Sequence, residues 1–275
     1  MKRLLFATVA CLAAMPAVAD PHDNMEWDSG VPVGPIANEW RFQQSDAIEA
    51  GHGRSGKAAV AAAAYDAPEA MTLSFIFHID DHFAEQDVFY ERAPGSGEVF
   101  RPTAATRDMD APLYAPAVEV PHNFLDTSDV GPYPAGRPLG ITVGEWFAAE
   151  GRGTYTCENG VGTVDLRFEN LVPHGVYTVW HDFMVWPPTD PFIGTYDLPF
   201  GARDGSENVF VADDDGSARF ERSVKPCLQL SGEHLAANLA IAWHSDGATY
   251  GPLPGEFSTV THVQLYVALP ARAGL

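Results

Sequence analysis

Short apolar stretches separated by turn residues constrain this chain more than any other feature. The sequence contains 25 glycines and 22 prolines, and few of its segments carry the long apolar spacing of an amphipathic helix. In segment 164–169, Val164, Leu166 and Phe168 alternate with charged residues. A period of two is typical of a β-strand with one buried face. The pattern predicts a mainly β fold: an antiparallel β-sandwich, immunoglobulin/fibronectin-like or jelly-roll-like, with few short helices.

Local signals mark a helix and a tight turn. Thr142 and Glu145 fit a capping box, in which each side chain satisfies a backbone N–H of the other residue. We therefore expect a short helix over 143–150. Asn159-Gly160 predicts a tight turn between strands, because both residues tolerate positive φ.

A hairpin is expected in the C-terminal half. Its strands would cover 208–212 and 217–221, joined through the acidic turn 213–216. Further strands are expected over residues 57–65, 71–78, 239–243 and 263–269. For residues 57–65 the alternative is a helix, on helix propensity.

Leu171, Pro173 and Tyr177 form an L-x-P-x-x-x-Y stretch between two expected strands. This stretch resembles the tyrosine corner of fibronectin type III and immunoglobulin-like sandwiches. In that motif, the tyrosine hydroxyl bonds the backbone a few residues upstream and fixes a crossover between sheets. The resemblance covers about ten residues and implies a fold class but no function.

The N-terminus predicts export. Lys2 and Arg3 precede an apolar stretch over 4–15, and Ala17-Val18-Ala19 is a small-x-small cleavage site. This is the pattern of a signal peptide, here residues 1–19, so we expect a periplasmic or secreted protein. A membrane span needs about 20 apolar residues. Neither this stretch nor any later one reaches that length, so no membrane span is expected.

Prolines concentrate between residues 110 and 140 and predict a division of the mature chain. We expect an N-terminal β-rich region over 20–130 and a C-terminal β-sandwich domain over 139–275. The alternative is a long crossing loop inside a single domain.

The charge of the chain bears on its partners. The formal net charge is −21, and it becomes more negative when Lys2 and Arg3 leave with the signal. Nucleic acid is not expected as a partner, because phosphate binding needs lysine and arginine patches. A strongly acidic protein attracts cations instead.

Two cysteines, Cys157 and Cys227, remain after the signal is removed. In an oxidising compartment they predict one disulfide. The alternatives are a metal thiolate or a reactive thiol.

Three histidines near strand ends are candidate zinc or copper ligands: His181, His244 and His262. Strand parity places His244 and His262 on one outer surface and buries His181, which favours a pair over a triad. The alternative is that all three are hydrogen-bonded structural histidines.

A second candidate metal site is His78, Asp80 and His82, which share one side of an extended segment. The alternative is a polar strand end. The acidic turn 213–216 is a candidate calcium site, although it lacks the EF-hand spacing, and a solvated turn is the alternative.

An aromatic, proline-rich loop runs from residue 186 to residue 200. Trp186, Phe192, Tyr196 and Phe200 are its candidate ligand-binding residues, since loops at the ends of sandwiches commonly carry function. Aromatic faces beside carboxylates suit a small molecule or a glycan. Alternatively, the loop packs its own aromatic side chains.

Signatures of catalysis are missing from the sequence: there is no G-x-S-x-G elbow, no P-loop and no G-x-G-x-x-G after a strand. We therefore expect an exported acidic β-sandwich that acts as a ligand-binding or structural module. Two alternatives stay open. One is a histidine-ligated metalloprotein or metalloenzyme; the other is an exported carbohydrate-active enzyme with paired carboxylates.

Overall fold

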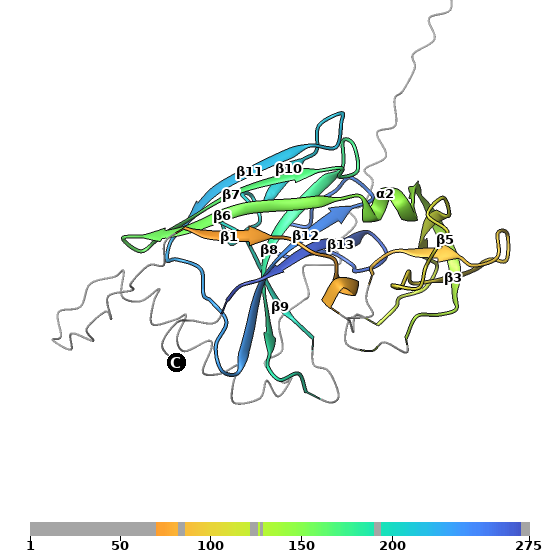
Figure 1. The fold of residues 1–275 in the computed structure, drawn as a ribbon, viewed down its shortest axis with the longest axis horizontal. Helices are drawn as coiled ribbons and strands as arrows, with labels where there is room; N and C mark the ends of the chain where they lie inside the picture. The colour runs from red at the N-terminus through yellow and green to blue at the C-terminus, as the bar shows by residue number, and fades with distance from the viewer. Residues whose placement is uncertain (1–69, 82–85, 122–125, 127–128, 190–193, 271–275) are drawn as a thin grey trace, which may run out of the picture. The chain divides into compact units, whose positions relative to one another are not determined.

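The computed structural model describes residues 70–81, 86–121, 126, 129–189 and 194–270, all within the compact unit Tyr65–Leu275. These residues form antiparallel sheets with one short α-helix and one 3-10 turn, which confirms the mainly β prediction (Figure 1). The predicted signal peptide, residues 1–19, and the predicted strand 57–65 lie outside the described residues.

A four-stranded sheet has the order β1-β6-β7-β11. Its strands are β1 (Met71–Ser74), β6 (Glu150–Glu158), β7 (Val161–Glu169) and β11 (Ala218–Val224). The predicted alternation holds in β7, where Val164, Leu166 and Phe168 are buried. The turn between β6 and β7 is also confirmed, since Asn159 and Gly160 have φ values of 52° and 75°.

A five-stranded sheet has the order β10-β8-β12-β13, and β9 also pairs with β8. Its strands are β8 (Val176–Val185), β9 (Tyr196–Pro199), β10 (Val209–Val211), β12 (Leu235–His244) and β13 (Thr261–Ala268). The register between β12 and β13 shifts after Ile241, so that Gln264 has no partner across the ladder. This shift is a β-bulge, which places one extra residue in a strand.

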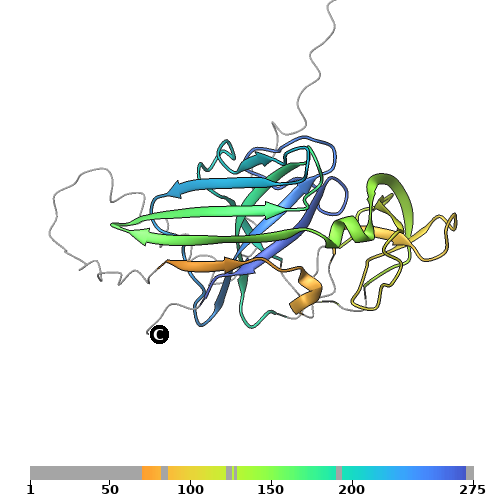
Figure 2. The same ribbon diagram turned by 45° about the horizontal axis from the view of Figure 1, so that its top comes forward.

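The inner faces of the two sheets pack on each other, consistent with a β-sandwich. Phe210 of β10 stacks on Phe168 of β7 and on Tyr177 of β8, each with ring centroids 5.3 Å apart. Phe200, which follows β9, meets Phe220 of β11 edge to face at 5.8 Å. Figure 2 shows the strands of the two layers crossing each other steeply.

A small closed barrel precedes β6. Its strands are β2 (Phe89–Glu91), β3 (Glu98–Phe100), β4 (Pro112–Pro116) and β5 (Tyr133–Thr142). Its core is formed by Phe89, Val99 and Val120. The proline-rich stretch therefore contributes two barrel strands, and the division at residues 130–139 stays a prediction.

The capping box after β5 is confirmed. The Thr142 hydroxyl accepts from Glu145 N–H over 3.3 Å, and the Glu145 carboxylate accepts from Thr142 N–H over 2.8 Å. The helix α2 (Val143–Phe147) is shorter than the predicted 143–150, because β6 begins at Glu150, which already pairs with Glu169 of β7.

Two strand predictions were wrong in their pairing or extent. Strands β10 and β11 do not form a hairpin: β10 pairs with β8 in one sheet, and β11 pairs with β7 in the other. The acidic turn between them reverses the chain but carries it from one layer to the other. Similarly, β1 ends at Ser74, and Ile76 then bridges to Tyr266 of β13 in the opposite sheet.

The tyrosine corner has the geometry that the resemblance implied. The Tyr177 hydroxyl accepts a hydrogen bond from Val172 N–H, five residues upstream, over 2.9 Å. Gly175 lies inside the corner, where an added Cβ would come within 2.7 Å of the Val172 carbonyl oxygen and 2.8 Å of the Tyr177 ring. A side chain at this position would therefore collide with the corner.

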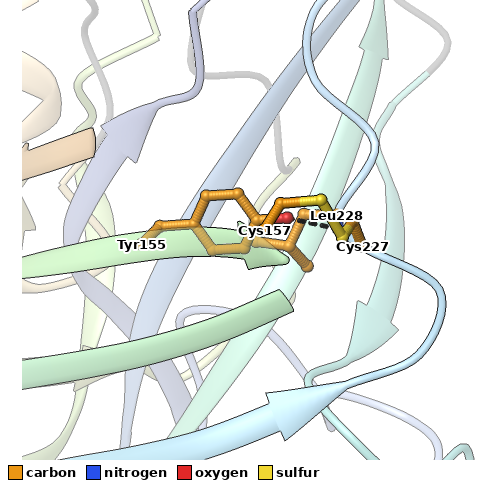
Figure 3. Close-up of a disulfide and its surroundings, with 4 residues drawn as sticks. All are labelled: Tyr155, Cys157, Cys227 and Leu228. Atoms are coloured by element: carbon orange, nitrogen blue, oxygen red, sulfur yellow. Dashed lines mark hydrogen bonds between the residues drawn. A yellow bond between two sulfur atoms is a disulfide. The ribbon is translucent and has the colours of Figure 1, made fainter. Parts of the chain in front are cut away.

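The predicted disulfide is confirmed. Cys157 and Cys227 are bonded, with their Cα atoms 5.8 Å apart and a sequence separation of 70. Next to the bond, Leu228 N–H donates to the Tyr155 hydroxyl over 2.8 Å (Figure 3). The two contacts tie the end of β6 to the segment that leads from β11 to β12.

Candidate functional site

A pocket lies on the outer face of the five-stranded sheet, away from the sandwich core. Residues of even number on β8 and β12 point to this face, and the central strand β12 contributes Ala236, Asn238 and Ala240. Larger side chains stand on both sides of this strand, among them Trp180 on β8 and Tyr266 on β13. A row of small residues between two rows of large ones leaves a hollow of about 340 Å³.

The floor of the pocket is apolar and well ordered by packing. Trp180, Ala240, Val263 and Tyr266 belong to one buried cluster, against which Ile76 and Phe257 pack. An outward sheet face is commonly polar and solvated. The apolar face of this sheet is therefore a feature that the sandwich core does not require.

Polar groups cross the pocket in one row. Asp197 of β9 lies directly opposite Asp182 of β8, and Asp182 lies directly opposite Asn238 of β12. The Asn238 side-chain amide donates to the Asp182 carboxylate over 2.8 Å. All three line the pocket. Two carboxylates and an amide are thus fixed on neighbouring strands by the sheet register.

Aromatic rings surround this polar row. The His78 ring stacks on the Tyr266 ring, with centroids 4.6 Å apart and an interplanar angle of 29°. Trp186 lies at the rim with 45% of its surface exposed. The indole N–H of Trp180 donates to the Thr178 hydroxyl over 2.7 Å, which fixes the ring within the floor.

The predicted cluster of His78, Asp80 and His82 does not lie in an extended strand. Residues His78–Asp81 form a 3-10 turn, so the period of two that placed these side chains together does not apply. Asp80 accepts a hydrogen bond from Phe77 N–H over 3.1 Å, and His78 faces the pocket. His82 lies outside the described residues.

His181 is buried, as strand parity predicted. Its Nε2 is 3.0 Å from the Gln229 carbonyl oxygen, to which it donates, and its ring leans on Phe183. Burial lowers the pKa of His181 to about 4, although the hydrogen bond to Gln229 acts in the other direction. At neutral pH this side chain is therefore an uncharged, hydrogen-bonded part of the interior.

His244 and His262 lie on opposite faces of the sheet, so the expected pair on one outer surface was wrong. The bulge at Gln264 reverses the parity of β13, and His262 falls opposite Trp243 on the inner face. His244 stays on the outer face, where its Nε2 is 2.8 Å from the Thr178 hydroxyl. A one-residue shift moves a side chain to the other face.

Both histidines have partners within the protein. His262 Nδ1 bonds the Asp87 carbonyl oxygen, and its Nε2 is 2.8 Å from the Ser245 hydroxyl. Burial lowers the pKa of His262 to about 4 and also lowers the pKa of His244. Within the described residues, no group of three or more histidine, cysteine, aspartate or glutamate side chains is arranged to hold a metal ion. The copper, zinc and calcium sites remain predictions without support from this geometry.

The side chains of the aromatic loop lie in different parts of the structure. Trp186 reaches the pocket rim, while Phe200 is buried in the core with 1% exposure. Tyr196 is 54% exposed and precedes Asp197 on β9, so it points away from the pocket. Phe192 lies outside the described residues.

Sequence reasoning missed most of the lining residues. Polar residues inside otherwise apolar strands were the available signal: Asp182 in β8 and Asn238 in β12 both lie within stretches of mainly apolar residues. Trp180 and Asp182 also share one parity, opposite to that of His181. His181, which lies between them in sequence, is a candidate metal ligand by residue type, but only its two neighbours line the pocket.

No protein-family model, no curated protein and no solved structure matches this chain. In the part of the chain that the structure describes, no helix has the length and hydropathy needed to cross a bilayer. What the pocket can bind therefore follows from the residues that line it.

Proposed function

We propose that this chain is an exported binding module whose β-sandwich holds a small organic ligand in the pocket on the outer face of β8, β12 and β13. The pocket carries the proposal: it has a volume of about 340 Å³, an apolar floor and a few polar groups. Ligand sites in proteins have this character, with volumes from roughly 300 Å³ upward. The floor lies on three paired strands, which makes the site largely pre-formed.

Export is supported by two independent features of the chain. Residues 1–19 have the three-part signal pattern. The Cys157–Cys227 disulfide is the kind of bond that persists in oxidising compartments. A periplasmic or secreted binding module accounts for both.

The test is a binding screen with a matched pair of variants. Ala236→Phe fills the hollow beside β8, and Val211→Phe adds the same ring on the exposed edge strand β10, where 56% of the side chain is accessible. Ligand-observed NMR with neutral saccharides, organic anions, organic cations and neutral alcohols measures binding to the purified exported protein. We expect at least one class to bind the wild type and Val211→Phe and to lose binding in Ala236→Phe. Equal binding to both variants, or binding of no class, would refute the proposal.

Hydrolysis of a glycan is a second candidate, favoured by the paired carboxylates of Asp182 and Asp197. Residues directly opposite each other in a sheet have Cβ atoms roughly 5 Å apart. Retaining glycosidases place their two carboxyl groups about 5 Å apart. Turnover of aryl glycosides by the wild type, abolished in both Asp182→Asn and Asp197→Asn, would establish this activity; absence of turnover leaves the binding module as the function.

A further inference from the structure

The polar lining of the pocket is dominated by carboxylates held close together. Asp182 and Asp197 are paired across β8 and β9, and Asp182 is buried. Like charges directly opposite each other in a sheet are unfavourable. The sheet register nevertheless holds both carboxyl groups at the same pocket.

None of the described residues that line the pocket is lysine or arginine. The whole chain carries 37 acidic against 16 basic residues, so its long-range field also attracts cations. This field would repel an anionic ligand as it approaches.

The rest of the lining is suited to an apolar cation. Trp180, Trp186 and Tyr266 present aromatic surface around the carboxylates. The faces of such rings attract ammonium groups, and tryptophan does so most strongly. A calcium or magnesium ion would need oxygen ligands throughout its coordination shell, which an aromatic floor does not supply.

We propose that the pocket selects small organic ammonium ions, with the cationic group beside Asp182 and Asp197 and its alkyl substituents against the aromatic floor. This proposal rests on the proposed function and names the class of ligand for the same pocket. It explains the aromatic floor and the paired carboxylates together: a charged head alone would not need the floor, and an apolar ligand would not need the carboxylates.

Choline and 3,3-dimethylbutan-1-ol test the proposal directly, because they have the same shape and differ in charge. Isothermal titration calorimetry on the full exported protein measures both. We expect choline to bind at least about tenfold more tightly than the neutral alcohol. Equal affinity of the two probes would overturn the proposal while leaving the binding pocket in place.

Charge variants identify the groups that make the protein bind choline more tightly than the neutral alcohol. Asp182→Asn keeps an oxygen that can accept from Asn238, and Asp108→Asn removes the same charge from an exposed position outside the pocket. We expect choline affinity to fall roughly tenfold or more in Asp182→Asn and to stay within about twofold in Asp108→Asn. Affinity for the neutral alcohol should change little in either. Asp197→Asn, which is half-buried on β9, repeats the test if Asp182→Asn does not fold.

Variants that lack an aromatic ring measure how much these rings contribute to choline affinity. Trp186→Ala removes a rim ring that lines the pocket, and Tyr196→Ala removes an exposed ring that faces away from it. Choline affinity should fall severalfold in Trp186→Ala and not in Tyr196→Ala. Tighter binding of a neutral saccharide than of choline would overturn the inference but retain the proposed function. If no probe binds, and the wider screen also finds no ligand, both proposals fail.

Discussion

The Tyr177 hydroxyl donates a hydrogen bond to the side-chain oxygen of Gln264 over 2.9 Å. Gln264 is the bulge residue of β13, and its amide nitrogen in turn donates to the Trp146 carbonyl oxygen over 3.0 Å. The tyrosine corner is thereby connected to the bulge and to helix α2. The same bulge brings His262 to the inner face and sets Val263 and Tyr266 toward the pocket.

Tyr177→Phe should lower the free energy of unfolding by about 2 kcal/mol. The substitution keeps the ring packing but leaves Val172 N–H and the buried Gln264 oxygen without the hydroxyl that bonds both. Urea unfolding followed by tryptophan fluorescence measures the change. A loss below about 0.5 kcal/mol, the range of an ordinary surface substitution, would show that the corner does not stabilise this fold.

Removing the disulfide should cost on the order of 4 kcal/mol, because the bond closes a loop of 70 residues. The measurement compares the urea midpoint of the wild type with that of a Cys157→Ala/Cys227→Ala variant. Alkylation of the unreduced protein followed by mass spectrometry is the control, and it should find no free thiol among these two residues. Labelling of both thiols would contradict the bonded state.

Stability should fall as the pH drops from about 6.5 to about 4. Burial lowers the pKa of both His181 and His262 from 6.5 to about 4 in the folded state. Between these values the unfolded chain binds protons that the folded chain does not, so acid favours unfolding. Each histidine contributes on the order of 3 kcal/mol across this interval and nothing to the slope above it.

A variant isolates this histidine contribution from that of the carboxylates. His181→Gln/His262→Asn removes both titrating rings while keeping an amide donor at each position. Urea unfolding between pH 7.5 and pH 4 should give a shallower decline for the variant than for the wild type. Parallel declines would mean that these histidines are not held neutral by burial. The charged and titratable groups that act on His262 are Asp87, Arg137 and His244.

Arg101→Met should destabilise the protein by about 3 kcal/mol, because it removes the guanidinium group beside the buried Asp87 carboxylate. Arg101 is 3% exposed and lies 3.7 Å from the Asp87 carboxylate, and it donates to the carbonyl oxygens of Gln86 and Pro121. Asp87 also accepts from the Ser258 hydroxyl and from Val263 N–H. The network therefore joins the segment before β2 to β13.

The double variant Arg101→Met/Asp87→Asn provides the control for this pair. An asparagine oxygen can still accept from its neighbours, and no unpaired charge is left. We expect the double variant to recover part of the loss in urea unfolding. If it is as unstable as the sum of the two single variants, the guanidinium and the carboxylate are not coupled.

The sequence by itself determined the features that depend on near neighbours. The alternation of Val164, Leu166 and Phe168 predicted β7, and Asn159-Gly160 predicted its turn. The capping box and the tyrosine corner each join residues three to five positions apart. Such contacts are fixed by local backbone geometry and side-chain reach, so the residues that make them are visible as patterns along the chain.

Only the tertiary structure decided how the strands were partnered and where the pocket lies. The turn after β10 reverses the chain whichever strand pairs with it, so the sequence could not show that β10 and β11 enter different sheets. A single bulge residue in β13 turned His262 inward, and periodicity alone does not reveal an inserted residue. The pocket combines Trp180, Asn238 and Tyr266 from three strands. Their proximity comes from the register of β8, β12 and β13, which is set by long-range backbone pairing and burial rather than by any local motif.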